Sequence, residues 1–282
     1  VRPKVTSNVD YLISLKEVLS NSVESHLISD VPIGIFLSGG IDSSLIASLA
    51  AERGAELSAF SLSSDAVEDA NYIEFISRMA KKWKFRHEHI VLSSEAAIAL
   101  LERMLPLADE PHGDAADVGV FALSNIAKTS VKVVLTGDGG DEVFGGYPRH
   151  RAHLISGSLG GVFRSLRWTL PVLGPVNRRR FLSMMEPDVA KRYASFHIPM
   201  GSSADNAASW LSEDLSRKVS YDAMLEGIRK HMVNKDPLSA ILSTDIKTVL
   251  QDSYLRKVDR ATMMAGVEGR LPFLDRKLVE FA

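Results

Sequence analysis

The stretch IGIFLSGGIDSS (residues 33–44) decides the predicted fold, because it joins a short apolar run to two glycines and the start of a helix. Residues 33–37 are too few and too uniformly apolar for a half-exposed helix, so they predict a buried strand. The adjacent glycines let the backbone turn tightly and approach a ligand closely. The Ser hydroxyls and the free amides at the helix start therefore predict an anion site, suited to pyrophosphate or a nucleotide.

Similar apolar runs recur along the first half of the chain, and segments of helical composition separate them. The candidate strands are 33–37, 57–62, 87–92 and 131–135, and the candidate helices are 9–28, 43–52, 72–83, 95–105 and 118–128. This alternation predicts a parallel α/β sheet of Rossmann-like type, covered by helices on both faces. Ligands of such sheets bind beyond the carboxyl ends of the strands. Because the strand signal fades near residue 150, we expect an α/β core over 1–150 and a mostly helical portion over 151–282 that completes the same active site.

Composition excludes several classes of protein. The 282 residues include 33 Lys and Arg against 35 Asp and Glu, a formal net charge of -2, which argues against a nucleic-acid binder held by phosphate neutralisation. No apolar run approaches the ~18 residues that span a bilayer, and no signal-peptide pattern opens the chain, so we expect no membrane association and a cytoplasmic location. The chain has no cysteine, which excludes disulfides, thiolate metal sites and Cys nucleophiles.

Asp42 is the unusual residue of the first loop, since a carboxylate beside a phosphate site repels the ligand. A Mg²⁺ ion between them removes that conflict, because hard cations take carboxylate and phosphate oxygens together. The loop is not a Walker A motif, because Gly40 stands where that motif needs lysine. The alternative interpretation is an ordinary turn in which Asp42 only caps the helix.

A second loop, TGDGGDEVFGGY (residues 136–147), also leads from an apolar strand into glycines and carries three acidic residues. Asp138 and Asp141 could each meet a metal ion or act on a proton. Clustered carboxylates repel one another unless a cation lies nearby. The alternative is an acidic, glycine-rich surface turn, but the sheet topology predicts both loops at the same edge.

Histidines and arginines follow the second loop at residues 149–153. His150 and His153, with Arg149 and Arg151, predict either a phosphate contact or a solvated helix face, and the sequence does not choose between them.

These motifs resemble a known family. LSGGIDSS (37–44) is similar to the pyrophosphate loop of the N-type ATP pyrophosphatases, and together with GDGGDEVFGGY (137–147) it resembles the synthetase domain of the glutamine-hydrolysing asparagine synthetase family. LRKVDRATM (255–263) and EGRLPFLD (268–275) resemble a late Lys-x-Asp-Arg and Glu-x-Arg-x-Pro-Phe-Leu-Asp signature of that family. The resemblance covers roughly residues 10–282 and implies an adenine-nucleotide-hydrolase-like sheet with a helical C-terminal portion.

Site residues follow from the resemblance position by position. It implies that the ATP phosphates are held by Ser38, Gly39, Gly40, Ser43 and Ser44. It places Leu37, Leu62 and Gly137 against the adenosine, and it assigns Mg²⁺ to Asp42 and Asp141. Asp138 stands where many members carry Glu near the reacting amine, and Lys257 or Arg260 supplies a late cationic group. For Lys257 and Arg260 the alternative is a solvated helix face paired with Asp252 or Asp259.

The implied function is that of an ATP- and Mg²⁺-dependent amide-forming ligase. A substrate carboxylate, for which the side chain of aspartate is the favoured candidate, attacks the α-phosphorus of ATP to give an acyl-adenylate and pyrophosphate. Ammonia then displaces AMP to give the amide, which is asparagine when the substrate is aspartate. Three alternatives stay open: a relative that amidates another carboxylate or closes a β-lactam ring, a non-catalytic nucleotide-binding module, and an ATP-using hydrolase or kinase. The last is disfavoured by the missing Walker lysine.

The resemblance also implies partners. Family members make ammonia in an N-terminal glutaminase domain with an N-terminal cysteine, whereas this chain starts at Val1 and has no cysteine. We therefore expect a synthetase domain cut at both ends, with the fused glutaminase domain missing and free ammonia required. The expected partners are small molecules, and a homodimer stays open.

Overall fold

The computed structural model describes residues 7–65, 70–109, 113–165, 182–197, 212, 221–233 and 236–282. The chain divides into two compact units, which are described separately below. Unit 1 comprises Val1–Val143 and Leu250–Ala282, and unit 2 comprises Phe144–Val249. Within the described ranges, no helix is both long enough and apolar enough to cross a membrane.

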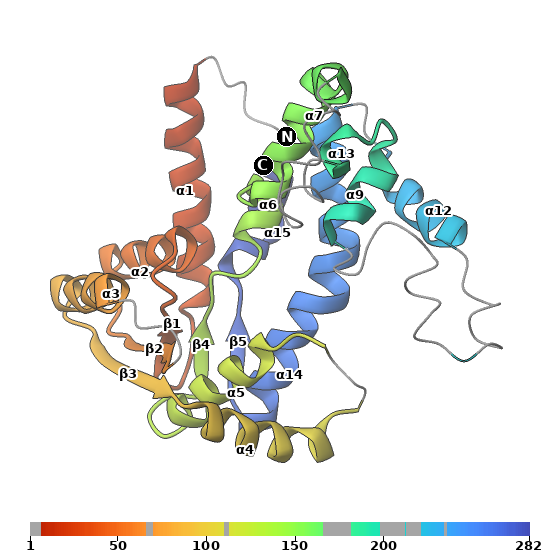
Figure 1. Ribbon diagram of the computed structural model, residues 1–282. Helices are drawn as coiled ribbons and strands as arrows, with labels where there is room; N and C mark the ends of the chain where they lie inside the picture. Colours follow the sequence, from red (N-terminus) through yellow and green to blue (C-terminus); the bar gives the residue numbers. More distant parts are fainter. Residues whose placement is uncertain are drawn as a thin grey trace. The chain divides into compact units, whose positions relative to one another are not determined.

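Unit 1 is built on a five-stranded parallel sheet with strand order β3-β2-β1-β4-β5 (Figure 1). The strands are β1 (Ile33–Phe36), β2 (Ser58–Ser64), β3 (Arg86–Leu92), β4 (Val133–Leu135) and β5 (Glu268–Arg270). The main helices are α1 (Asn8–His26), α2 (Ile41–Glu52), α3 (Ala70–Trp83), α4 (Ser94–Met104), α5 (Ala116–Ala127), α14 (Leu255–Ala265) and α15 (Arg276–Phe281). Short 3₁₀ turns cover Leu105–Leu107 and Pro272–Leu274, and the short helix α6 (Gly140–Phe144) follows β4. The predicted parallel α/β sheet is confirmed.

Helices cover both faces of this sheet, which explains why all four residues of β1 are buried. Ile33 and Ile35 point to one face and pack with apolar side chains of α1, α2, α3 and α15. Phe36 points to the other face and packs in the cluster that contains Phe60, Val134 and Ala127 of α5. A third cluster joins α4, α5 and α14 through Met104, Phe121, Ala261 and Ala265. Because successive side chains of β1 point to opposite faces of the sheet, the strand packs in both apolar clusters.

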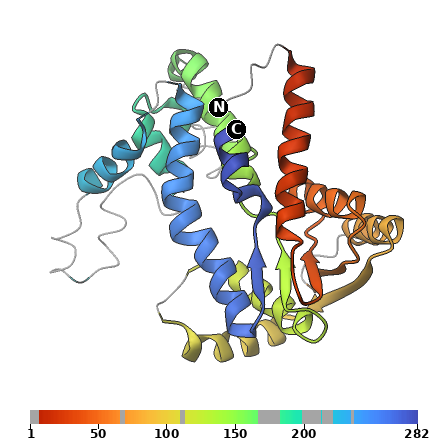
Figure 2. The same cartoon turned by 180° about the vertical axis from the view of Figure 1, so that it is seen from behind.

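Strand β5 was not expected, since the sequence predicted a mostly helical portion after residue 150 and indicated no strand there. Its residues, Glu268-Gly269-Arg270, pair in parallel with Val133–Leu135 of β4 and extend the sheet (Figure 2). None of the three carries an apolar side chain, so no hydrophobic run marks the strand. With β5, residues 250–282 belong to the sheet-containing unit. The functional division into a core over 1–150 and a completing portion over 151–282 stays a prediction.

Every regular element in the described residues of unit 2 is a helix. Its longer helices are α7 (Pro148–Ser165), α9 (Val189–His197), α12 (Tyr221–His231) and α13 (Pro237–Asp245), and a π-helix (Ile246–Tyr254) follows α13. Ala190 and Ala194 of α9 form an apolar cluster with Leu225 of α12.

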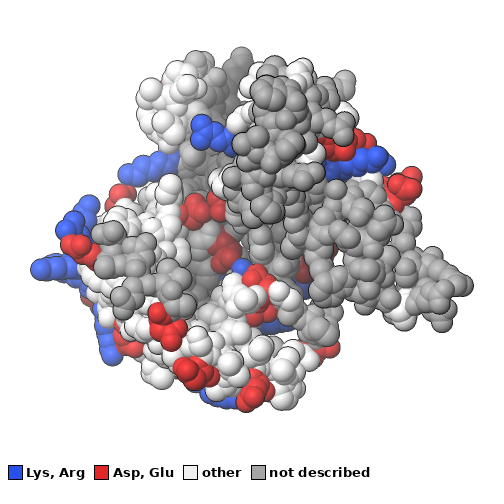
Figure 3. Space-filling model, in the orientation of Figure 1, with Lys and Arg blue, Asp and Glu red and all other residues white. Residues whose placement is uncertain are grey.

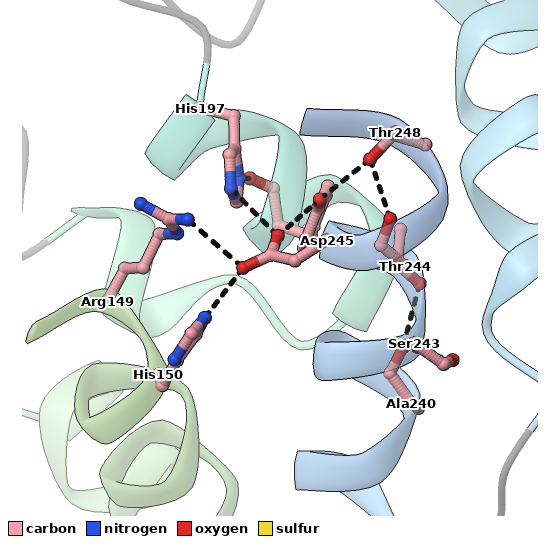
Figure 4. A network of polar contacts seen from close by, with 9 residues as sticks. Arg149, His150, His197, Ala240, Ser243, Thr244, Asp245 and Thr248 are labelled. Carbon is pink, nitrogen blue, oxygen red and sulfur yellow. Dashed lines mark hydrogen bonds and ion pairs between the residues drawn. The ribbon is translucent and has the colours of Figure 1, made fainter. Parts of the chain in front are cut away.

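A buried carboxylate, Asp245, connects three helical segments of unit 2 (Figure 4). Its Oδ2 lies 2.6 Å from His150 Nε2 and 3.0 Å from Arg149 Nη2, and its Oδ1 lies 3.1 Å from His197 Nε2. Tyr193 donates its hydroxyl hydrogen to Oδ1 at 2.6 Å. Burial alone raises the pKa of Asp245, but the hydrogen bonds from His150, His197 and Tyr193 outweigh it and hold that pKa well below its usual range.

This network corrects one expectation. His150 and His153 are each only 1% exposed, so they do not lie on a solvated helix face. His150 and Arg149 bind Asp245, and His153 Nδ1 accepts a hydrogen bond from Arg192 Nε at 3.1 Å. The partners of these histidines, Asp245 and Arg192, lie far away in the sequence. The sequence therefore could not show that the histidine side chains point inward.

Candidate functional site

The first loop leaves the buried end of β1 and is held by its own hydroxyl groups. Leu37 extends the ladder, since its amide donates to Phe60 O at 2.8 Å. The hydroxyl oxygens of Ser38 and Ser43 lie 3.1 Å apart, and the Ser38 hydroxyl accepts from Gly40 N at 3.3 Å. Gly39 adopts a φ of +68°, in the left-handed region that favours glycine. The tight, glycine-dependent turn predicted here is confirmed.

Helix α2 starts directly after this turn. Gly40 is its N-cap and supplies no side chain to satisfy the amides of the first turn. Two hydroxyl oxygens on the two loops, Ser44 Oγ and Thr136 Oγ1, are buried and have no hydrogen-bond partner among the residues that the structure describes. A buried hydroxyl without a partner costs stability, so its presence fits a bound polar ligand.

Asp42 joins the two loops into one site. A Cβ atom built on Gly140 would lie 2.6 Å from Asp42 Cγ and 2.9 Å from both carboxylate oxygens. A Cβ atom on Gly137 would lie 2.8 Å from Ser43 N and 3.2 Å from Asp42 Cβ. Only glycine at these two positions lets the second loop approach the start of α2 so closely. The predicted meeting of both loops at one sheet edge is confirmed by these contacts.

Asp42 lies in an acidic environment. Burial, together with the nearby carboxylates of Asp141, Glu142 and Asp138, raises its pKa to about 6. Glu142 is 1% exposed, whereas Asp138 and Asp141 are half-buried. Figure 3 shows acidic side chains gathered near the middle of the face in view, in the region of β4 and α6. The free protein therefore concentrates negative charge that a cation would relieve.

Tyr72 is a site residue that the sequence interpretation missed. Its hydroxyl group lies 3.5 Å from Leu37 O and 3.4 Å from Leu62 O, at the ends of β1 and β2. A Cβ atom on Gly39 would lie 2.7 Å from its ring. Burial raises the pKa of Tyr72, so the hydroxyl stays protonated and able to donate. Tyr72 was interpreted only as one apolar position of an amphipathic helix, because helical spacing does not reveal which loop a side chain covers.

Lys257 and Arg260 do not form the solvated face considered as an alternative. The Lys257 side chain is only 13% exposed, and its Nζ lies 3.3 Å from Oδ2 of Asp114, not beside Asp252 or Asp259. Arg260 is half-buried on the same helix, α14. Asp114 was not predicted, because it lies 143 residues away in the sequence.

Contacts of α14 with β5, and of β5 with Thr136, place Lys257 near the level of the second loop. Helix α14 doubles back along β5 (Figure 2), since a Cβ atom on Gly269 would lie 3.2 Å from Val258, the residue after Lys257. Arg270, the last residue of β5, accepts from the amide of Thr136 at 2.9 Å, and Thr136 begins the second loop. The cationic end of α14 therefore lies toward the carboxyl edge of the sheet, where the two loops also lie.

A parallel α/β sheet with two glycine–carboxylate loops at its carboxyl edge defines a nucleotide-binding type of enzyme fold. The chain belongs to the asparagine synthase family, whose model matches residues 14–282. This membership confirms the family resemblance read from the motifs.

Individual relatives agree with this membership. A protein of Mycobacterium tuberculosis named among the glutamine-hydrolysing asparagine synthetases is 30% identical over 277 residues, covering 94% of this chain and 41% of that protein. Asparagine synthetase [glutamine-hydrolyzing] 1 of Bacillus subtilis is 26% identical over 283 residues, covering 100% of this chain and 45% of its own length. Amidase chyE of Penicillium rubens is 27% identical over 307 residues, covering 95% of this chain and 45% of its own length. The chain thus spans less than half the length of each of these proteins.

Proposed function

We propose that the chain forms the synthetase active site of an asparagine synthetase, where ATP is used to make the amide. In this proposal a substrate carboxylate, most simply the side chain of aspartate, attacks the α-phosphorus of ATP and releases pyrophosphate. Ammonia then attacks the acyl carbon of the adenylate and AMP leaves, which gives the amide. The observation that carries the proposal is the contact of Asp42 with Gly140, because it brings a phosphate-type loop and an acidic loop together at the carboxyl edge of the sheet.

The first loop would hold the nucleotide. Ser38, Gly39, Gly40, Ser43 and Ser44 are proposed to bind the phosphates, through backbone amides of the uncapped α2 start and through hydroxyls. The unpartnered, buried Ser44 Oγ fits this role. Leu37, Leu62 and Gly137 are proposed to lie against the adenosine, with Tyr72 bridging the carbonyls of the two leucines.

The carboxylates would hold Mg²⁺, and the residues present fit that ion. The raised pKa of Asp42 shows that its anionic form is unfavourable beside Asp141, Glu142 and Asp138 until positive charge arrives. Among the described residues no three His, Asp or Glu side chains form a preformed metal site, so we propose that Asp42 and Asp141 share the ion with phosphate oxygens of ATP. When bound, Mg²⁺ would neutralise charge on the departing pyrophosphate.

The remaining charged residues would act on the acyl group. Asp138 is proposed to take up the proton that ammonia releases on attack. Lys257 or Arg260 is proposed to stabilise negative charge on the reacting phosphoryl group or on the tetrahedral intermediate. The fused glutaminase domain of the family, a homodimer and a cytoplasmic location stay proposals.

The products of ATP cleavage test the proposal. Incubation with ATP, Mg²⁺, aspartate and ammonium should release AMP and pyrophosphate in equal amounts, with asparagine formed in step. Release of ADP and phosphate would refute it. Pyrophosphate release with a different carboxylate, and none with aspartate, would keep the ligase chemistry and replace the acceptor, an outcome to which the match with Amidase chyE gives specific weight.

A further inference from the structure

The feature that carries a further inference is the ion pair between Asp114 and Lys257, which connects two helices of unit 1. Asp114 lies just before α5, and Lys257 lies in the first turn of α14. The two helices pack together through Phe121 of α5 and Ala261 and Ala265 of α14. The pair is therefore fixed at both ends by a packed apolar interface.

The surroundings of the ammonium group make this pair different from a surface ion pair. The side chains of Lys257 and Asp114 are 13% and 28% exposed, and their charged atoms lie 3.3 Å apart. Lys16 and Glu52 lie at a similar 3.2 Å, but their side chains are 64% and 51% exposed. Surface pairs contribute little, whereas an enclosed ammonium needs its partner to offset the loss of water.

Asp114 is itself held in one orientation. Its Oδ1 accepts from the amide of Ala116 at 3.0 Å, and its backbone oxygen accepts from the amide of Asp117 at 3.1 Å. Because one carboxylate oxygen is taken by the start of α5, the other points to Lys257. The aromatic ring of Tyr254, the last residue of the π-helix that precedes α14, lies 4.8 Å from the same ammonium group.

A long lysine side chain has several rotatable bonds, so a catalytic lysine gains from groups that restrict it. We infer that Asp114 is a positioning residue, which holds the Lys257 ammonium group in one orientation at the carboxyl edge of the sheet. The role of Asp114 in the reaction rests on the proposed function. Of the two candidate cationic residues, Lys257 and Arg260, the inference selects Lys257 as the one that acts in the reaction. The ion pair between Asp114 and Lys257 rests on the geometry alone.

Asp114→Asn separates the two tasks of the side chain. Asparagine keeps an oxygen that can accept from Ala116 N, but it removes the charge that faces Lys257. Asp114→Glu restores the charge, and Glu52→Gln removes the carboxylate of the exposed Lys16 pair as a matched control. Circular dichroism establishes that each variant is folded.

Two measurements on the intact chain test the inference. The first is the rate at which acetic anhydride labels individual lysines, followed by mass spectrometry. Loss of the ion pair releases the largely buried Lys257 side chain toward solvent, so Asp114→Asn should label Lys257 about tenfold faster. Labelling of Lys16 should not change in that variant, and Asp114→Glu should restore slow labelling. Unchanged labelling of Lys257 would overturn the inference.

The second measurement is pyrophosphate release with ATP, Mg²⁺, aspartate and ammonium. We expect Asp114→Asn to lower kcat about tenfold with the KM for ATP within about twofold, because positioning acts on the reacting state and not on nucleotide binding. Glu52→Gln should keep both constants. A normal kcat in Asp114→Asn would overturn the positioning role even if labelling changes. Absence of pyrophosphate release by the unaltered chain, with labelling changed as expected, would instead refute the proposed function and leave only the ion pair.

Discussion

Replacing Asp42 by Asn should stabilise the ligand-free protein while it abolishes turnover. The pKa of Asp42 is raised from 3.8 to about 6, so its charged form disfavours folding. At 1.36 kcal/mol per unit this shift corresponds to about 3 kcal/mol, and solvent screening of a half-buried group reduces it to about 1 to 2 kcal/mol. Asn has nearly the same shape and still fits against Gly140, but it carries no charge.

The pH dependence distinguishes this electrostatic cause from better packing. Below about pH 3 the carboxyl group is protonated in the folded and the unfolded chain, so the two proteins should be equally stable. As the pH rises from about 4 through about 6, the normal protein loses stability relative to Asp42→Asn, and the difference should be complete above pH 7.

Urea unfolding followed by circular dichroism measures the difference at pH 4.5 and at pH 7.5. The matched control is Asp30→Asn, because Asp30 is exposed and lies outside the acidic cluster. Addition of Mg²⁺ at pH 7.5 should stabilise the normal protein more than Asp42→Asn. A variant less stable than the normal protein at pH 7.5, or a difference that ignores pH, would refute the reasoning.

Three further substitutions test other parts of the structure. Asp245→Asn should destabilise unit 2 by about 3 to 5 kcal/mol in urea unfolding, because it leaves buried cationic groups without their carboxylate; an unchanged midpoint would contradict the network in Figure 4. Gly140→Ala should lower pyrophosphate release about 10²-fold by displacing Asp42, whereas Gly119→Ala, whose Cβ meets no atom within 4 Å, should not. Ser44→Ala should stabilise the free protein by about 1 kcal/mol in urea and reduce its protection by ATP, because the buried hydroxyl has no partner among the described residues; unchanged protection would remove Ser44 from the nucleotide site.

The sequence predicted the parts of the fold in which burial is continuous. Residues 33–37 and 133–135 carry no polar or charged side chain because helices cover both faces of the central strands, so the strands could be recognised without their neighbours. Strand β5 has no such pattern, since Glu268-Gly269-Arg270 lies at the edge of the sheet. Its pairing depends on α14, which leads the chain back to β4, and that is a tertiary effect.

The same difference applies to the candidate site. Both glycine loops are local, and their order in the chain was enough to predict that they meet. Asp114 and Tyr72 reach the site from distant positions in the sequence. From its neighbours alone, Asp114 is only a polar residue shortly before a helix, and Tyr72 is only one residue of a helix. Only packing of α5 on α14, and of α3 on the first loop, shows which groups they contact.

The charges of unit 1 suggest why the acidic and basic parts of the site are held apart in the free protein. Lys257 could offset the charge of Asp42, but its ammonium group is bound to Asp114 on the α5 side. The acidic loops therefore keep their mutual repulsion, which adds to the effect of burial in raising the pKa of Asp42. A site whose carboxylates were already neutralised by lysine would gain little from a divalent cation. If Asp42 and Asp141 bind Mg²⁺ as proposed, the ion pair of Lys257 with Asp114 would leave these carboxylates available to the cation, so Asp114→Asn should also weaken the stabilisation of the protein by Mg²⁺.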